Sequence, residues 1–246
     1  MSEPLPGASV MMTEKSIRPI AYIEGDFPEK FGIPRQSGLV NTQAEIHFLP
    51  EYRKPEAFRG LEEYSHLWLI WDFSEAEGTN WRPTVRPPRL GGNQRVGVFA
   101  TRSPFRPNGM GLSCVKLTTI DWEHEDGPVL IVSGADLMNG TPIYDVKPYL
   151  PHIDAYPEAE AGFAGRVKEY GLGVSIPPEI EESLSEEKRE KIPALKEILA
   201  EDPRPAYQEN PERVYGMSFA GMEVRFRVVD GVAEVCEIEE NRNEMQ

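Results

Sequence analysis

The chain has 246 residues and contains little cysteine and little histidine, with two of the first and four of the second. Cys114 and Cys236 have no C-x-x-C partner, and no histidine pair has the spacing of a zinc site, so no metal is expected. Both cysteines lie in apolar, strand-like sequence. We expect two buried, reduced thiols rather than a disulfide. The four histidines are scattered, and we expect each of them to be structural.

Long hydrophobic runs are also missing. No stretch approaches the roughly 18 apolar residues of a transmembrane helix. The first residues, MSEPLPGASVMMTEK, lack the basic start and apolar core of a secretory signal. We therefore expect residues 1–16 to be a disordered leader and the protein to be cytoplasmic.

Several common catalytic motifs are absent. The chain has no glycine-rich loop of the P-loop or dinucleotide-binding type, no G-x-S-x-G elbow and no zinc-deaminase signature. The regular alternation of strands and helices that marks a doubly wound fold is missing as well. These absences exclude the most familiar nucleotide-binding and hydrolase classes.

Positive charge is scarce overall but concentrated in one place. The formal net charge is −15 and the pI is near 4.8, which argues against a protein that coats nucleic acid over its whole surface. Between Arg82 and Lys116, however, there are seven cationic residues and no carboxylate. Such a distribution is suited to holding one anionic segment locally.

The first two thirds of the chain read as short strands joined by Gly/Pro-rich links, which predicts a mainly β fold, a barrel or a sandwich. In the strand at 112–122, alternation places Ile120 on the face opposite Val115 and Leu117. One short helix is expected around 55–63. The predicted strands are residues 17–24, 44–49, 65–73, 96–100, 112–122 and 129–135.

Beyond a Gly/Ala/Glu-rich linker at 156–173, the pattern indicates a small α+β domain at 174–246. Ser183-x-x-Glu186 has the spacing of a capping box, and an apolar stripe after Pro193 predicts a further helix. Alternating apolar residues from Met222 to Val228 predict a half-buried strand. Asp230-Gly231 then predicts a tight turn into the next strand.

Residues 101–111, TRSPFRPNGMG, are the most unusual segment. Two prolines restrict the backbone and bias the residues before them towards extended geometry. Arg102 and Arg106 project two guanidinium groups, and Gly109 and Gly111 allow a ligand or another backbone to approach closely. We interpret the segment as an anion-binding site.

Three other segments combine turn residues with polar side chains. PRQSGLV at 34–40 is either a turn before a strand or part of a ligand pocket. WRPTVRPPRLGGN at 81–93 is either a solvated loop or a surface for nucleic acid, because arginine beside tryptophan suits stackable anions. In NGTPIYDVKPY at 139–149, Asp145 and Lys147 share one strand face. They form either a surface salt bridge or part of a proton-transfer site.

Together these segments resemble the TsaA-like (TrmO) family of tRNA N6-adenosine methyltransferases. The resemblance runs in order along nearly the whole chain and departs from the family pattern only slightly, with Asn139 where aspartate is usual and Met110 where isoleucine is common. The matching pieces are PRQSGLV at 34–40, GLEEYSHLWLIWDF at 60–73, WRPTVRPPRLGGNQRVGVFATRSPFRPNGMG at 81–111, NGTPIYDVKPYLP at 139–151 and DPRPAY at 202–207.

The resemblance implies a β-barrel methyltransferase domain at 17–156 that uses S-adenosylmethionine, together with the small C-terminal domain. It implies a homodimer, with no membrane and no metal. The implied partner is the anticodon arm of tRNA and the implied acceptor is N6 of N6-threonylcarbamoyladenosine at position 37. By the family pattern, cofactor contacts are expected from Gln36, Ser37, Gly38, Phe73, Ser74, Arg102, Leu112, Gly134, Ala135 and Asp136.

The acceptor nitrogen must lose a proton, so a positioned base is expected. Asp145 and Asp136 are the candidates, with Lys147 orienting one of them. Substrate or RNA contacts are expected from Arg35, Arg82, Arg86, Arg89, Arg106 and Asn108. Two other functions stay open from the residues themselves: a non-catalytic RNA-binding barrel, and a barrel enzyme that acts on another small acceptor.

Overall fold

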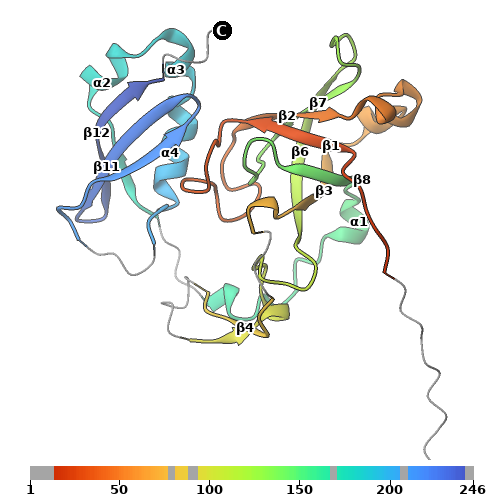
Figure 1. Ribbon diagram of the computed structural model, residues 1–246. Coiled ribbons are helices and arrows are strands. Elements are labelled where there is room, and N and C mark those ends of the chain that lie inside the picture. The colour runs from red at the N-terminus through yellow and green to blue at the C-terminus, as the bar shows by residue number, and fades with distance from the viewer. Residues whose placement is uncertain (1–13, 77–80, 88–93, 167–170, 206–209, 242–246) are drawn as a thin grey trace, which may run out of the picture.

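A computed structural model describes residues 14–76, 81–87, 94–166, 171–205 and 210–241 (Figure 1). Residues 1–13 of the expected leader and the candidate RNA-binding residue Arg89 lie outside the described residues. No helix in these ranges has the length and apolar character that a membrane crossing requires.

The first part of the chain is a closed barrel of six antiparallel strands (Figure 1), which confirms the mainly β prediction and selects the barrel over the sandwich. Its strand order is β1-β2-β7-β6-β3-β8, so every edge is paired. The barrel strands are β1 (Ala21–Gly25), β2 (Gln43–Phe48), β3 (His66–Asp72), β6 (Met110–Asp121), β7 (Val129–Ser133) and β8 (Pro142–Pro148).

Alternating side chains fill this barrel. On β3, Leu67, Leu69 and Trp71 point inward and are buried, while the residues between them are partly exposed. Ile46 of β2 and Ile143 of β8 are completely buried and belong to the same core. The period-two geometry of a strand therefore directs one face of β3 into the barrel interior.

Two details of the barrel differ from the sequence prediction. Ile120 faces inward with Val115 and Leu117, because the register between β6 and β7 shifts between Leu117 and Thr119. Such a bulge reverses the alternation beyond it, and no local pattern announces it. Of the two cysteines, Cys114 is partly buried but Cys236 is exposed, so the prediction of two buried thiols is wrong for Cys236.

Two local predictions also need correction. The helix expected at 55–63 is two separate 3₁₀ turns, Pro55–Phe58 and Leu61–Glu63, because Gly60 between them has a left-handed backbone with φ of 85°. The strand expected at 96–100 stops early: β5 (Val96–Gly97) pairs with β4 (Thr84–Val85), and a 3₁₀ turn, Val98–Ala100, follows.

The C-terminal domain is a four-stranded sheet of order β10-β11-β12-β9 with short helices. The tight turn at Asp230-Gly231 is confirmed, with φ of 48° and 77° between β11 and β12. The capping box is wrong: Ser183 ends a helix, and its hydroxyl donates to the Ile180 carbonyl at 2.8 Å. The sheet strands are β9 (Gly173–Ser175), β10 (Tyr215–Phe219), β11 (Met222–Val229) and β12 (Val232–Glu240), and the helices of the chain are α1 (Pro151–Asp154), α2 (Pro178–Ser183), α3 (Glu186–Glu190) and α4 (Ile192–Ala200).

The segment between β1 and β2, residues 26–42, links the barrel to the C-terminal domain. Phe27 and Val40 are buried in the apolar core of the C-terminal domain, not in that of the barrel. That core lies between the sheet and α4, and α4 is on the side of the sheet that faces the barrel (Figure 1). The two parts of the chain therefore share one structural element, and this element also reaches the site described next.

Candidate functional site

A cavity of about 820 Å³ lies where the 26–42 segment, the end of β3 and residues 101–112 come together. Its volume falls within the usual range for small-molecule sites. Eight of the residues predicted from sequence line it: Arg35, Gln36, Phe73, Ser74, Arg102, Arg106, Leu112 and Asp136. Side chains that are separated by up to about a hundred positions in the chain are thus brought into one pocket.

Four of the predicted cofactor residues lie behind the wall rather than on it. The Ser37 hydroxyl accepts a hydrogen bond from the Cys114 amide at 3.1 Å, and the Gly38 amide donates to the Gly134 carbonyl at 2.9 Å. Gly134 has a φ of 83°, and a Cβ there would lie 3.3 Å from the Gly38 backbone. Ala135 is buried in the barrel core. These four residues attach the 26–42 segment to the barrel.

A chain of hydrogen bonds that runs behind the pocket wall through Ser113 ends at Asp136, which lines the pocket. Trp71 Nε1 donates to Ser113 Oγ at 2.9 Å, and Ser113 Oγ donates to Asp136 Oδ1 at 2.5 Å. Enclosure of the carboxyl raises the pKa of Asp136, while the Ser113 hydrogen bond and the positive charge of Arg102 act in the opposite direction. The Asp136 carboxylate is therefore fixed in position by a hydrogen bond and has an increased affinity for a proton.

Sequence reasoning missed Ser113 and Trp71 as site residues. Ser113 is 1% exposed and lies on the inward face of β6 with Val115 and Leu117. A hydroxyl on an otherwise apolar strand face needs a buried hydrogen-bond partner. The position of Ser113 among apolar residues in the sequence is therefore the signal that could have predicted its role. Gly111 completes the arrangement, since a Cβ on it would lie 2.2 Å from the Trp71 ring. The sequence predicted that Gly111 allows a ligand or another backbone to approach closely, and in the structure the group that approaches it is the Trp71 ring.

The two arginines of the 101–111 segment have different surroundings. Arg102 is exposed at the pocket and donates to the Gln36 side-chain oxygen. Arg106 donates to the Thr101 carbonyl at 2.6 Å and lies 5.9 Å from the centre of the Phe99 ring. Within the described residues, neither guanidinium forms an ion pair with a carboxylate. Positive charge is therefore left available at the pocket.

Asp145 and Lys147 form a salt bridge of 2.8 Å on β8, in which both side chains are roughly half exposed. The Asp145 carboxylate raises the pKa of Lys147. Neither residue lines the cavity, although Asp145 is paired with Ile70 on β3, which is paired in turn with the pocket residue Leu112. The pair thus belongs to a row of residues that leads across the sheet from the pocket.

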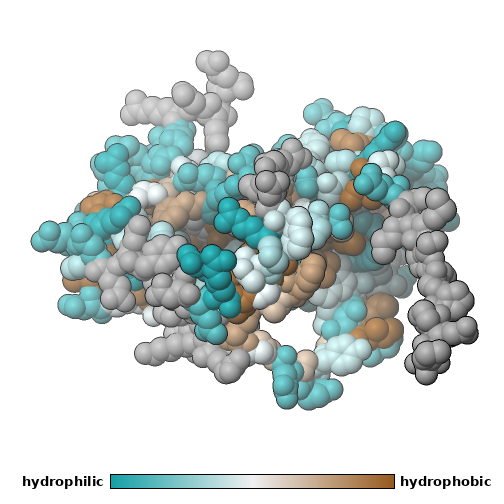
Figure 2. Space-filling view, turned by 60° about the horizontal axis from the view of Figure 1, so that its bottom comes forward, coloured by the Kyte–Doolittle hydropathy of each residue, from teal (hydrophilic) through white to brown (hydrophobic). Residues whose placement is uncertain are grey.

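Three further candidate RNA contacts that the structure describes, Arg82, Arg86 and Asn108, lie outside the cavity. Arg82 is exposed and its guanidinium lies 5.8 Å from the centre of the Phe105 ring. Arg86 and Asn108 are exposed as well. Figure 2 turns the lower part of Figure 1 forward and shows strongly hydrophilic side chains next to apolar ones on this face. A surface of this kind suits a partner with both phosphates and bases.

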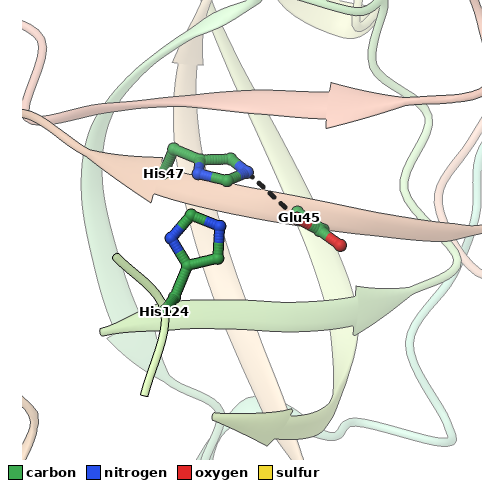
Figure 3. Close-up of side chains that lie close together, drawn as sticks. All are labelled: Glu45, His47 and His124. Carbon is green, nitrogen blue, oxygen red and sulfur yellow. Dashed lines mark hydrogen bonds and ion pairs between the residues drawn. The ribbon is translucent and has the colours of Figure 1, made fainter. Parts of the chain in front are cut away.

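A separate group of potential metal ligands, Glu45, His47 and His124, lies on the outside of the barrel (Figure 3). Glu45 accepts a hydrogen bond from His47 Nε2 at 3.1 Å, and His124 Nδ1 accepts one from the Asp126 amide at 3.1 Å. When neutral, each ring therefore carries its proton on Nε2, and His47 Nδ1 is buried without a hydrogen-bond partner among the described residues. The arrangement favours a histidine–carboxylate cluster that holds the β6–β7 turn. The histidines are scattered along the sequence, so their spacing does not predict this cluster.

The cavity fits a ligand such as S-adenosylmethionine. Trp71 and Phe73, with ring centroids 4.4 Å apart, provide an aromatic wall. Arg102 is placed to pair with a carboxylate, and Asp136 with a positive centre.

Comparison with known proteins agrees with this geometry. The family model for the tRNA-methyltransferase O N-terminal domain matches residues 22–155, and that for the TrmO C-terminal domain matches residues 169–241. A tRNA (adenine(37)-N6)-methyltransferase of Escherichia coli is 42% identical over 234 residues, 93% of this chain and 99% of that protein. A putative S-adenosylmethionine-dependent methyltransferase of Pseudomonas aeruginosa is 40% identical over 225 residues, 86% of this chain and 91% of its own length. A crystal structure of TrmO from P. aeruginosa superposes with a TM-score of 0.74 at 32% identity, covering 94% of this chain and all of that one.

Proposed function

The chain belongs to the TrmO family of tRNA methyltransferases, and we propose that this S-adenosylmethionine-dependent enzyme methylates N6 of N6-threonylcarbamoyladenosine at position 37, beside the anticodon. The observation that carries the proposal is one pocket that holds an enclosed carboxylate, Asp136, together with two cations, Arg102 and Arg106, that form no ion pair with a carboxylate in the part of the chain that the structure describes. Methyl transfer to a neutral nitrogen requires a base, and the threonyl group of the acceptor adds a carboxylate that requires a cation.

Asp136 is the proposed base. N6 of this acceptor is a weak nucleophile because its lone pair is delocalised into a urea-like group, so it must lose its proton before or during attack. The raised pKa of Asp136 makes its carboxylate a better proton acceptor, and Ser113 holds one of its oxygens in place. When bound, S-adenosylmethionine supplies an electrophilic methyl group. The protein contributes the alignment of the acceptor and the removal of its proton.

Arg102 and Arg106 are proposed to select the modified base. A guanidinium can bind a carboxylate with two parallel hydrogen bonds. Plain adenosine would leave one of these charges without a partner at the pocket, and that loss is how polar sites reject analogues that lack the matching group. Because the cofactor also carries a carboxylate, we assign one guanidinium to each of the two carboxylates, with Arg102, which contacts Gln36, on the cofactor side.

The test is methylation of two tRNAs that differ only in the threonylcarbamoyl group. The protein is incubated with isotopically labelled S-adenosylmethionine and each tRNA, and the nucleosides are then analysed by mass spectrometry. We expect label only in the modified adenosine. Equal labelling of plain adenosine would overturn the substrate assignment. Tight tRNA binding without any labelling would instead favour the non-catalytic RNA-binding barrel.

We further propose that the enzyme is a cytoplasmic homodimer. Met110 and Leu112, which line the pocket, are 43% and 53% exposed, and Phe99 nearby in the sequence is 73% exposed. Large apolar side chains that are exposed together at a pocket are typical of a surface covered by a partner. Light scattering should give twice the mass of the chain, and a monomer at micromolar concentration would contradict the proposal.

A further inference from the structure

Residues 26–42, here called the bridging segment, contact the pocket on one side and the C-terminal domain on the other. We propose that the C-terminal domain sets the affinity for S-adenosylmethionine by holding the bridging segment in place. In this view residues of α4 and β10 are positioning residues for the pocket. The inference rests on the proposed use of this pocket for the cofactor.

Apolar contacts attach both ends and the middle of the bridging segment to the C-terminal domain. Phe27 and Val40 are 2% and 1% exposed, and both lie in the core formed with α4 and β10. The rings of Phe27 and Phe219 are 5.5 Å apart. At Gly32, where φ is 98°, a Cβ would lie 2.7 Å from the Met217 side chain. The segment thus takes its shape against the C-terminal domain.

Polar contacts tie down the same two ends. Lys191 Nζ, next to the start of α4, lies 2.8 and 3.1 Å from the two carboxylate oxygens of Asp26. At the other end, the Asn41 amide donates to the Glu197 carboxylate on α4 at 2.8 Å. One contact comes from the residue that precedes α4 and the other from α4 itself, so this part of the C-terminal domain holds the bridging segment at its beginning and at its end.

Arg35 connects the C-terminal domain to the pocket directly. Its Nη2 donates to the Asp202 carbonyl, just after α4, at 2.8 Å, and its side chain also lines the cavity. The neighbouring Gln36 lines the cavity and accepts a hydrogen bond from Arg102. A change in the position of α4 must therefore move Arg35 and Gln36 relative to Arg102.

The charge of the C-terminal domain supports a positioning role over a role as a tRNA clamp. Residues 174–241 contain 17 carboxylates and eight lysines and arginines. On the exposed face of the sheet, Arg225 and Arg227 are paired with Glu237 and Glu234. Such a surface repels a polyanion. The cationic surface of the chain is on the barrel, whereas the C-terminal domain supplies the fixed side of the pocket.

The first test uses full-length protein in which both charged ties are neutralised, Asp26→Asn with Glu197→Gln, and a control, Glu182→Gln, at an exposed position of α2. Titration calorimetry measures the Kd for S-adenosylmethionine, and a thermal melt checks folding. We expect the Kd of the double variant to rise by at least about threefold, because hydrogen bonds to charged groups are lost, and that of the control to stay unchanged. An unchanged Kd in the double variant would overturn the inference. If the unaltered protein fails to bind S-adenosylmethionine, the proposed function fails instead.

The second test needs no variant and relies on the reciprocity of coupled sites. The Ala220 amide donates to the Asp26 carbonyl at 2.8 Å, and the Ser218 amide donates to the Glu29 carboxylate at 2.9 Å. If these contacts raise cofactor affinity, cofactor binding must strengthen them. We expect S-adenosylmethionine to slow hydrogen exchange at these two amides and not in β9 on the far edge of the sheet. Unchanged exchange at both amides in the saturated protein would contradict the coupling.

Discussion

At the scale of single residues, the site depends on a few side chains that are held with little freedom. Ser113 is almost fully buried and connects the Trp71 indole to the Asp136 carboxylate through two hydrogen bonds. Gly111 is small enough to lie against that indole. The position of Asp136 thus follows from three neighbours that do not themselves need to react, while burial of its carboxyl raises its proton affinity.

Asp136→Asn is expected to lower the single-turnover methylation rate by about 10²–10⁴-fold, the usual contribution of a general base. The carboxylate must be deprotonated to act, so the rate of the unaltered protein should rise with pH through the raised pKa of Asp136. A pH–rate profile of both proteins checks this. If the rising limb persists in the variant, the base is another group.

Asp136→Asn should also change how the stability of the protein depends on pH. The rate of the unaltered protein should rise with pH, whereas its stability should fall. The pKa of Asp136 in the folded protein is raised above its ordinary value of 3.8, so the folded state binds this proton more tightly than the unfolded state. The free energy of unfolding therefore falls as pH rises between the two pKa values. Thermal melts from about pH 4 to about pH 7 should show that the Tm of the variant increases relative to that of the unaltered protein as pH increases. A constant difference in Tm would contradict this sign.

Gly111→Ala is expected to destabilise the protein by about 1–3 kcal/mol, since overpacking forces the surrounding side chains to shift. The added Cβ would lie 2.2 Å from the Trp71 ring, and moving the ring breaks its hydrogen bond to Ser113. Cofactor binding should weaken as well. Gly97→Ala is the matched control, because nothing lies within 4 Å of a Cβ at that position. Equal stability of the two variants, measured in denaturant, would disprove the clash.

At the scale of elements, the stiffness expected of residues 101–111 has a visible basis. Two hydrogen bonds between residues two positions apart turn the backbone. The Ser103 amide donates to the Thr101 hydroxyl at 3.2 Å, and the Arg106 amide donates to the Pro104 carbonyl at 2.7 Å. The Arg106 side chain also returns to the Thr101 carbonyl. One of the two guanidiniums therefore shapes the loop that presents the other.

Strand β8 offers a second element-scale prediction. The Asp145–Lys147 salt bridge lies outside the pocket on a row of paired residues that includes Ile70 and Leu112. We expect Asp145→Asn to lower the single-turnover rate while leaving the Kd for S-adenosylmethionine unchanged, because the carboxylate is away from the cavity wall. Lys147→Met serves as the comparison for loss of the same salt bridge. Normal methylation by the Asp145 variant would remove it from the reaction.

At the scale of the whole molecule, charge is segregated. The net charge is −15, yet every charged residue between Arg82 and Lys116 is a cation. The C-terminal domain carries much of the negative charge. A polyanion is therefore expected to meet the barrel by its 82–116 face and to be repelled elsewhere.

The affinity for tRNA should fall steeply with salt, since each neutralised phosphate releases counterions. We expect Arg82→Ala and Arg86→Ala each to reduce the slope of log K against log salt concentration by about one, measured by filter binding or anisotropy. The control is Arg225→Ala, whose guanidinium is paired with Glu237 at 3.0 Å in the C-terminal sheet. A salt-independent affinity would contradict phosphate contacts by these arginines.

The sequence by itself determined the features that depend on neighbours in the chain. Apolar and aromatic composition predicted β3, and the Asp230-Gly231 turn followed from the backbone freedom of those residues. The arginines and glycines of residues 101–111 likewise predicted a binding site from neighbouring residues alone. Proline, glycine and a period of two act over a few residues, so they can be read locally.

Only the tertiary structure decided which distant residues meet. It placed Ser113 against Asp136, moved Ile120 inward through a bulge and left Asp145 outside the cavity. It also gave Phe27 and Val40 to the C-terminal core, although both lie within the barrel sequence. These outcomes depend on strand register and on contacts between residues up to about two hundred positions apart, which closing the barrel and packing α4 set together. A local pattern contains no information on that register, because every face it predicts is defined only relative to its own strand.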